Sequence, residues 1–313
     1  MSNHTINAHK RVIRAFSEKS DSYSTWAKFQ KEAAVCLSGW LPEHVNGPVL
    51  EAGAGTGLFT RFLSAKYPTV PILITDASEE MLMACRNELN SSLKGEADRG
   101  SEKKPAQAAS VHHLMIGELH HEHANNGFGL KNGIKPGLRF AVYNPEEEGP
   151  IPGKYDLVAS ALTAQWFSDF NTGLAVLAGS VSEGGHIILS YLTNTSFPEW
   201  AGKCNDLDIP FTANRLPDEG SGGDVLRSLG FQVRSDHIRM QIGYRSALDF
   251  FRSLKFTGAS TQLGGIRNSA SDMKRLISAM NQPAGKDSQL GNIAITYGLD
   301  IVAGIKTDQP DII

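Results

Sequence analysis

The chain has 313 residues, 41% of them hydrophobic, and its 30 basic and 33 acidic side chains leave a net charge of −3 at pH 7. These values predict a globular, soluble protein with a substantial core, built as one large domain or two small ones. A charge this close to neutral argues against nucleic-acid or membrane binding. Because residues 1–14 hold no apolar signal core and no run reaches the roughly 20 apolar residues of a membrane span, we expect a cytoplasmic location.

The first predicted element is a helical region over residues 8–41, which Pro42 ends. Within it Tyr23 lies seven positions after Phe16, and Gln30 lies seven positions after Tyr23. Aromatic residues at such spacing belong to a core more often than to a binding site. The residues alone therefore assign them no function.

The most informative stretch is Val49–Gly57, in which an apolar run reaches Glu51 and three glycines follow at alternate positions. From Leu58 onwards apolar residues recur at helical spacing. This pattern, E-x-G-x-G-x-G, predicts a strand, a tight turn and a helix. Glycine permits positive φ and lets a ligand approach the backbone. By itself the turn is weak evidence for a site, because glycine turns also occur where nothing binds.

A second short strand is predicted over Val70–Asp76, followed by a helix that Ser78 caps. Asp76 lies nineteen residues after Gly57. In a nucleotide-binding βαβ unit an acid at that place accepts hydrogen bonds from ribose hydroxyls. Glu51 would repel a pyrophosphate but would tolerate the ammonium of a methionine group. The two acids therefore favour a nucleoside ligand that carries no phosphate.

Residues 91–139 interrupt the alternation of strands and helices with a composition typical of loops. The segment holds half of the chain's ten histidines, at positions 112, 113, 120, 121 and 123. We interpret it as a surface insertion and not as a metal site, because no cysteine accompanies the histidines and no element there would orient them. Cys36, Cys85 and Cys204 are interpreted as reduced, mostly packed thiols.

The third and fourth strands are predicted over Leu138–Tyr143 and Tyr155–Ser160. The fourth continues into Ser160-Ala161-Leu162-Thr163-Ala164-Gln165-Trp166. In a doubly wound sheet the carboxyl ends of the strands form the ligand crevice, so this turn is expected to face the glycine turn. Simple packing of Trp166 is the competing interpretation. The remaining pattern predicts helices at 171–181, 198–210, 218–229 and 247–255, and strands at 186–192, 231–244 and 293–306.

The glycine turn and Asp76 resemble those of class I S-adenosylmethionine-dependent methyltransferases. Four further strings are similar to the malonyl-[acyl-carrier protein] O-methyltransferases of biotin synthesis: F-x6-Y with Gln30, S-x-L-x-x-Q-W at 160–166, A-N-R at 213–215 and R-S-L-K-x-x-G-A at 252–259. The resemblance covers most of residues 10–306 outside the insertion. It implies an α/β fold, a doubly wound, mostly parallel, seven-stranded Rossmann-like sheet with a helical cap.

The resemblance also implies a division of the chain. A helical cap would span residues 1–45, and the S-adenosylmethionine-binding core would span 46–195 with the insertion at about 91–139. Residues 196–285 would complete the cap and substrate region and include one core helix and strand, and 286–313 would form the last core strand and tail.

Cofactor contacts are implied for a set of residues at the ends of the first four strands and in the cap. The set is Tyr23, Gln30, Glu51, Gly53, Ala54, Gly55, Gly57, Asp76, Ala77, Met81, Asn144, Ser160 and Leu162. In the family the residue matching Tyr23 lies over cofactor and substrate. Family members usually carry an acid after the third strand that meets the adenine amino group; here Asn144 or Glu146 would have to serve.

The implied reaction is methylation of the free carboxylate of malonyl-acyl-carrier protein or malonyl-coenzyme A, with no metal, nucleic acid or membrane involved. Such a carboxylate needs a cation to orient it, and Arg binds it with a two-pronged fork. Arg215 and Arg252 are the candidates, and they join Tyr23 and Trp166 as predicted catalytic residues. A local excess of basic residues over 231–275 would suit an acidic carrier protein, although a solvated surface is the commoner meaning of such a run.

Two other functions stay open from the sequence. The chain could methylate another small carboxylic acid or, less favoured by its charge, RNA. It could also be a non-catalytic, methyltransferase-like binding protein, as the altered segment at Asn144 and the insertion would allow. Measured affinity for S-adenosylmethionine separates this last hypothesis from the enzymes.

Overall fold

The computed structural model describes residues 23–97, 112–114, 137–256, 268–282 and 292–307. The predicted helix before Tyr23 and three of the insertion's histidines, at 120, 121 and 123, lie outside these ranges. The chain divides into two compact units. Unit 1 comprises Met1–Glu32, Leu192–Glu219 and His237–Leu299, and unit 2 comprises Ala33–Tyr191, Gly220–Asp236 and Asp300–Ile313.

The strands form one eight-stranded sheet in the order β3-β4-β2-β1-β5-β6-β8-β7. They are β1 (Val49–Ala52), β2 (Ile72–Asp76), β3 (His112–Leu114), β4 (Leu138–Val142), β5 (Tyr155–Ala161), β6 (Val181–Leu192), β7 (Phe231–Tyr244) and β8 (Ile293–Lys306). The pairs from β3 to β6 are parallel. Because β1 lies between β2 and β5, the carboxyl ends of these three strands meet at one edge, and the segments that leave them are neighbours.

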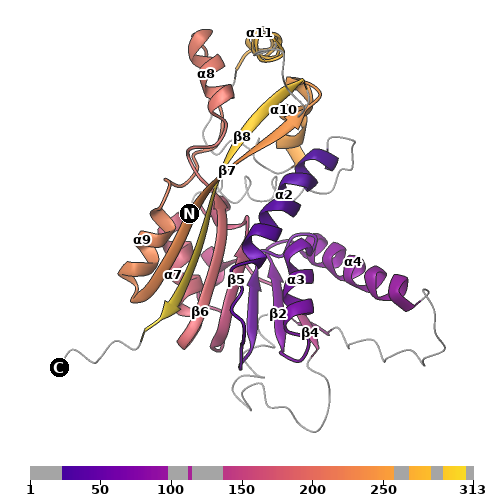
Figure 1. Cartoon of the computed structure of the whole chain (residues 1–313), viewed down its shortest axis with the longest axis vertical. Coiled ribbons are helices and arrows are strands. Elements are labelled where there is room, and N and C mark those ends of the chain that lie inside the picture. The colour runs from indigo at the N-terminus through magenta and orange to yellow at the C-terminus, as the bar shows by residue number, and fades with distance from the viewer. Residues whose placement is uncertain (1–22, 98–111, 115–136, 257–267, 283–291, 308–313) are drawn as a thin grey trace. The chain divides into compact units, whose positions relative to one another are not determined.

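Helices of unit 2 accompany these strands (Figure 1). They are α3 (Leu58–Lys66), α4 (Glu79–Ala97), α6 (Pro145–Glu148), the 3₁₀ helix η1 (Ala164–Trp166), α7 (Phe170–Gly179) and α9 (Ser221–Ser228). Helix α4 packs on β2 and β4, and α7 packs on α9. The core between them is apolar and includes Leu50, Val158, Leu174 and Ile187 without exposed surface. Apolar residues at alternate positions of strands and at helical spacing produce this core.

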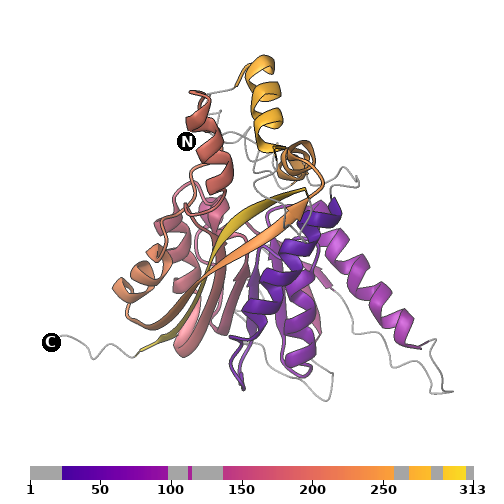
Figure 2. The same cartoon turned by 45° about the horizontal axis from the view of Figure 1, so that its top comes forward.

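Unit 1 contains residues 23–32 of helix α2 (Tyr23–Ser38). It also contains the helices α8 (Pro198–Asp206), α10 (Ala247–Phe256) and α11 (Ala270–Met280). Helix α11 contacts both α8 and α10, and Figure 2 shows the three helices grouped with the adjoining ends of β7 and β8. Their core is aromatic: the rings of Phe29 and Tyr297 stack at 4.4 Å, and Trp200 meets Phe250 edge-on at 5.9 Å. Such pairs stabilise a small unit beyond the area they bury.

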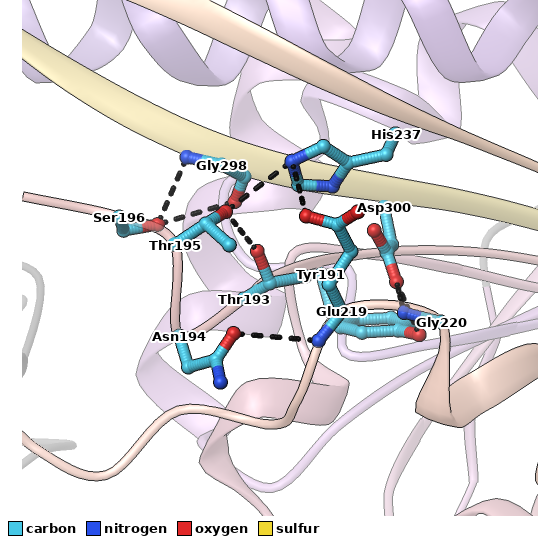
Figure 3. Close-up of polar contacts among 10 residues, drawn as sticks. All are labelled: Tyr191, Thr193, Asn194, Thr195, Ser196, Glu219, Gly220, His237, Gly298 and Asp300. Carbon is cyan, nitrogen blue, oxygen red and sulfur yellow. Dashed lines mark hydrogen bonds and ion pairs between the residues drawn. The ribbon is translucent and has the colours of Figure 1, made fainter.

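Polar contacts fix the loops next to these strands (Figure 3). In unit 2 the Tyr191 hydroxyl donates to Asp300 at 2.9 Å, and the Gly220 amide donates to the same carboxylate at 2.8 Å, which ties the start of α9 to β6 and β8. In unit 1 His237 Nε2 lies 3.0 Å from Glu219 and 3.3 Å from the Thr195 hydroxyl. Each unit is thus internally braced by its own hydrogen bonds.

The predicted α/β fold is confirmed, and all seven expected strands are present. Several details of the prediction are wrong. Helix α4 runs to Ala97, beyond the expected start of the insertion at residue 91, and His112–Leu114 form an eighth strand within it. This strand forms because β4 offers a parallel partner, pairing His113 with Phe140. Helix α11 was not predicted. The expected helix from residue 218 begins only at Ser221, after Gly220 with φ 84°.

In the described part of the chain, no helix combines the length and apolar character needed to cross a membrane. The same residues contain no group of three or more His, Cys, Asp or Glu side chains suited to a metal ion. The described cysteines, Cys36, Cys85 and Cys204, are free thiols, and the last two are buried.

Candidate cofactor site

The three glycines of the predicted turn connect β1 to α3, and all have positive φ: 73° at Gly53, 54° at Gly55 and 86° at Gly57. Their surroundings differ. A Cβ on Gly53 would lie 2.2 Å from Thr163 Oγ1, and one on Gly57 would lie 2.6 Å from Cys85 Sγ. A Cβ on Gly55 would meet no described atom within 4 Å. Two glycines therefore make room for the protein's own side chains, and Gly55 faces open space in which a ligand can approach the backbone.

Asp76 at the end of β2 ties the glycine turn to the next strand. Its Oδ2 accepts a hydrogen bond from the Gly55 amide at 2.8 Å, and its Oδ1 accepts one from the Ser78 amide at 2.9 Å. Burial raises the pKa of Asp76, and the backbone amides of Ser78, Gly55 and Ala77 oppose that rise. Each carboxylate oxygen can accept a second hydrogen bond, so Asp76 can also receive a ribose hydroxyl.

Glu51 lies in the central strand, paired with Ile74 of β2 on one side and Ala159 of β5 on the other, and only 1% of it is exposed. Burial raises the pKa of Glu51 to about 8, with a hydrogen bond from Thr60 opposing and the charge of Asp76 adding to the rise. Its Oε2 has no hydrogen-bond partner among the described residues. This oxygen of the buried carboxyl therefore lacks a partner, which a bound ammonium group would provide.

Replacing Glu51 with glutamine is expected to change how stability depends on pH. Between its ordinary pKa of 4.5 and about 8, Glu51 has lost its proton in the unfolded chain but keeps it in the folded one. Stability of the ligand-free protein should therefore fall as pH rises through this window. Glu51→Gln removes that slope, so its stability relative to the wild type should rise by about 2–4 kcal/mol between pH 5 and 8.5.

Urea unfolding of both proteins at the two pH values measures this difference. Glu147→Gln is the matched control, because Glu147 is exposed in α6 of the same unit. Parallel pH profiles for the wild type and Glu51→Gln would contradict the assignment of the raised pKa to Glu51.

The end of β5 and the segment after it lie against the glycine turn, as predicted. The Ser160 hydroxyl donates to the Ala52 carbonyl at 2.8 Å, and the Thr163 hydroxyl donates to the Gly53 carbonyl at 3.1 Å. Leu162 has the left-handed φ of 53°, which is rare for a residue with a side chain. Sequence reasoning missed Thr163, because no local signal links a threonine to a glycine 110 positions earlier.

Asn144 and Glu146 both have structural partners after β4. The Asn144 side chain caps α6 by accepting from the Glu146 amide at 3.2 Å. Glu146 Oε1 accepts from the amide and hydroxyl of Ser168, at 2.7 and 2.6 Å. Capping accounts for Asn144 without any ligand. Its side-chain oxygen can still accept a second hydrogen bond, so its contact with adenine stays a prediction.

The other predicted residues are placed as follows. Ala54 and Met81 are buried, Ala77 is exposed, and Trp166 is half-buried at the end of η1. Tyr23, Gln30, Arg215 and Arg252 belong to unit 1. Gln30 is half-buried, both arginines are exposed, and the Tyr23 side chain is outside the described set. The structure thus brings the glycine turn together with Asp76 and Ser160, whereas the functional roles assigned to all these residues stay predictions.

The residues of unit 2 fit a nucleoside that carries an amino-acid group. Gly55 provides open backbone, Asp76 provides acceptors for hydroxyl groups, and Glu51 provides a buried negative charge when it ionises. No lysine or arginine is among the predicted contacts in this turn, which would disfavour a phosphate.

Comparison with known proteins adds the following relatives. No protein-family model matches the chain. A malonyl-[acyl-carrier protein] O-methyltransferase from Magnetococcus marinus is 27% identical over 241 residues, which cover 76% of this chain and 72% of the relative. The biotin biosynthesis bifunctional protein BioCD from Bordetella avium is 26% identical over 259 residues, covering 82% of this chain but 45% of that longer protein.

Among solved structures, a candidate methyltransferase from Bacillus halodurans superimposes with a TM-score of 0.53 at 10% identity, covering 88% of this chain and 99% of the other. A likeness at this identity concerns the fold. The chain is therefore a distant relative of the malonyl-[acyl-carrier protein] O-methyltransferases and has the Rossmann-like fold of class I methyltransferases, as its motifs predicted.

Proposed function

We propose that this protein is an S-adenosylmethionine-dependent methyltransferase that esterifies the free carboxylate of malonyl-acyl-carrier protein or malonyl-coenzyme A. The observation that supports it most is the glycine turn, in which Gly55 faces open space while its amide is held by Asp76 at 2.8 Å. The names of the two relatives support the acceptor and the link to biotin synthesis.

The bound cofactor would supply a methyl group on a sulfonium. Methyl transfer is an in-line displacement, so the protein's task is to hold the acceptor oxygen at near-attack distance in line with that group. A malonyl carboxyl has a pKa of roughly 4 and is already ionised near pH 7, so no general base is needed. The site's residues act by binding, orienting and excluding water.

Within unit 2 we assign cofactor binding to the turn and its surroundings. Gly53, Ala54, Gly55 and Gly57 give the backbone its shape, Asp76 receives the ribose, and Glu51 offsets the ammonium charge. Because the pKa of Glu51 is raised to about 8 before binding, an ammonium ligand would draw a proton off this carboxyl. Affinity for the cofactor should then rise between pH 6 and 8.

For acceptor binding we keep the residues that the sequence predicts, Arg215, Arg252, Tyr23 and Trp166. Arg215 is our first choice for the carboxylate, because it is exposed and has no ion pair with a described residue. Arg252 lies 4.0 Å from Asp249, which Arg245 also approaches at 3.6 Å. Tyr23 is kept as a proposed contact of cofactor and substrate. Masking the charge as a methyl ester would let enzymes that prefer apolar chains elongate the product towards the biotin precursor.

The direct test incubates the protein with S-adenosylmethionine and malonyl-carrier protein or malonyl-coenzyme A, and mass spectrometry looks for one added methyl group. Acetyl-carrier protein is the control, because it lacks the free carboxylate. If only one malonyl compound gains a methyl group, that compound is the acceptor. If both gain one, the protein accepts either. Cofactor binding without methylation of either would favour another carboxylic acid, and absence of cofactor binding by calorimetry would overturn the enzyme proposal.

A further inference from the structure

The side chain of Thr163 fills the space that Gly53 leaves empty. A Cβ on Gly53 would lie 2.2 Å from Thr163 Oγ1, 2.3 Å from Cγ2 and 2.7 Å from Cβ. All three distances are well below van der Waals contact. The absence of a side chain at Gly53 therefore lets β5 and its following turn approach the cofactor turn.

Hydrogen bonds hold the glycine turn from two sides. On the β5 side, the Ser160 hydroxyl donates to the Ala52 carbonyl, and the Thr163 hydroxyl shares its proton between the carbonyls of Gly53 at 3.1 Å and Ala161 at 3.2 Å. On the β2 side, the amides of Gly53 and Ala54 both donate to the Thr75 carbonyl, at 2.8 and 2.9 Å. The turn's donors and acceptors are thus satisfied by opposite neighbours, which fixes the peptide planes leading to Gly55.

Thr163 is itself held by an unusual bend at Leu162. With φ 53°, Leu162 donates its amide to the Ser190 carbonyl at 2.8 Å, and its carbonyl accepts from the Gln165 side chain at 2.8 Å. Gln165 is 7% exposed. A left-handed leucine is unfavourable by itself and persists only where neighbouring bonds impose it. Here the buried amide of Gln165 and strand β6 impose it, and the result is that Thr163 points at the glycine turn.

We propose that Thr163 is a positioning residue for the cofactor. Through its contact with Gly53 it holds the glycine turn in the shape that leaves Gly55 open to the ligand. Gln165 in turn holds Thr163 in place through its hydrogen bond to Leu162. This inference rests on the proposed function, because it assigns the turn to S-adenosylmethionine. It predicts that the hydroxyl of Thr163 and the packing of this side chain against Gly53 affect cofactor affinity more than they affect the rate of methyl transfer.

The test compares Thr163→Val, which keeps the shape and removes the hydroxyl, with Thr163→Ser, which keeps the hydroxyl. Calorimetry with S-adenosylmethionine should show about 3–10-fold weaker binding for Thr163→Val, the expected effect of one hydrogen bond. Thr163→Ser should stay within about 2-fold of the wild type. At saturating cofactor the rate of Thr163→Val should fall less than its affinity does, and its urea unfolding should remain a single cooperative transition. Thr69→Val, an exposed threonine of the same unit, is the control.

A second comparison tests the packing. Gly53→Ala should weaken binding strongly in the wild type, where the methyl group meets Thr163. In a Thr163→Gly background the same change should weaken it much less, because the colliding atoms are gone. Equal affinity of the wild type and Thr163→Val, or additive effects in the second comparison, would overturn the inference. A wild type that binds no S-adenosylmethionine would instead overturn the proposed function.

Discussion

Replacing Gly55 with valine is expected to abolish binding of S-adenosylmethionine while the protein stays folded. Gly55 has φ 54°, and a Cβ there would meet no described atom within 4 Å. The new side chain would therefore collide with no described neighbour in the folded protein, and its cost to folding should be backbone strain, about 1–3 kcal/mol. It would, however, fill the open space beside the turn. We expect calorimetry to show affinity lowered by at least roughly 100-fold.

Gly184→Val separates strain from loss of the ligand's space. Gly184 has φ 71° and equally open surroundings among the described atoms, but it lies near the start of β6, away from the carboxyl ends of the strands. This variant should lose similar stability in urea and keep its affinity for the cofactor. If Gly55→Val binds S-adenosylmethionine normally, the glycine turn is not part of the cofactor site. If both variants lose binding, general destabilisation explains the loss.

Replacing Arg215 with alanine is expected to lower kcat/KM for malonyl thioesters by roughly 2–4 kcal/mol, with cofactor affinity unchanged. This magnitude applies to a charge-assisted pair formed away from water; a loss below about 1 kcal/mol would identify a solvent-exposed contact instead. Arg215→Lys should recover part of the activity, since lysine keeps the charge but not the two-pronged geometry. Steady-state kinetics with both malonyl-carrier protein and malonyl-coenzyme A provide the measurement.

Arg252→Ala and Arg245→Ala complete this comparison. Both arginines lie near Asp249 and are exposed, so either change alters the same local charge. If Arg252→Ala alone abolishes activity, the carboxylate binds at α10 and not at Arg215. If none of the three alanine variants loses activity, the acceptor is not held by these arginines and the malonyl assignment fails, while the cofactor site is untouched.

The sequence by itself determined the order of the seven expected strands and the location of the glycine turn. Both depend on residues close together in the chain: apolar residues at period two or 3.6 give the elements, and the glycines between Glu51 and Leu58 permit the positive φ that the turn requires. The motif strings, among them those at 160–166 and 213–215, indicated a resemblance to the malonyl-[acyl-carrier protein] O-methyltransferases, and the comparisons confirmed that resemblance.

Only the tertiary structure shows which neighbouring atoms, if any, require glycine at each position of the turn. Gly53 and Gly57 look equivalent to Gly55 in the sequence, yet they make room for Thr163 and Cys85, whose positions depend on neighbouring strands and helices. It also decided that His112–Leu114 form a strand, because β4 supplies hydrogen-bond partners that a loop-like composition does not reveal. Backbone preferences act locally and can be read along the chain, whereas contacts such as that between Thr163 and Gly53 join residues 110 positions apart and exist only once the sheet is assembled.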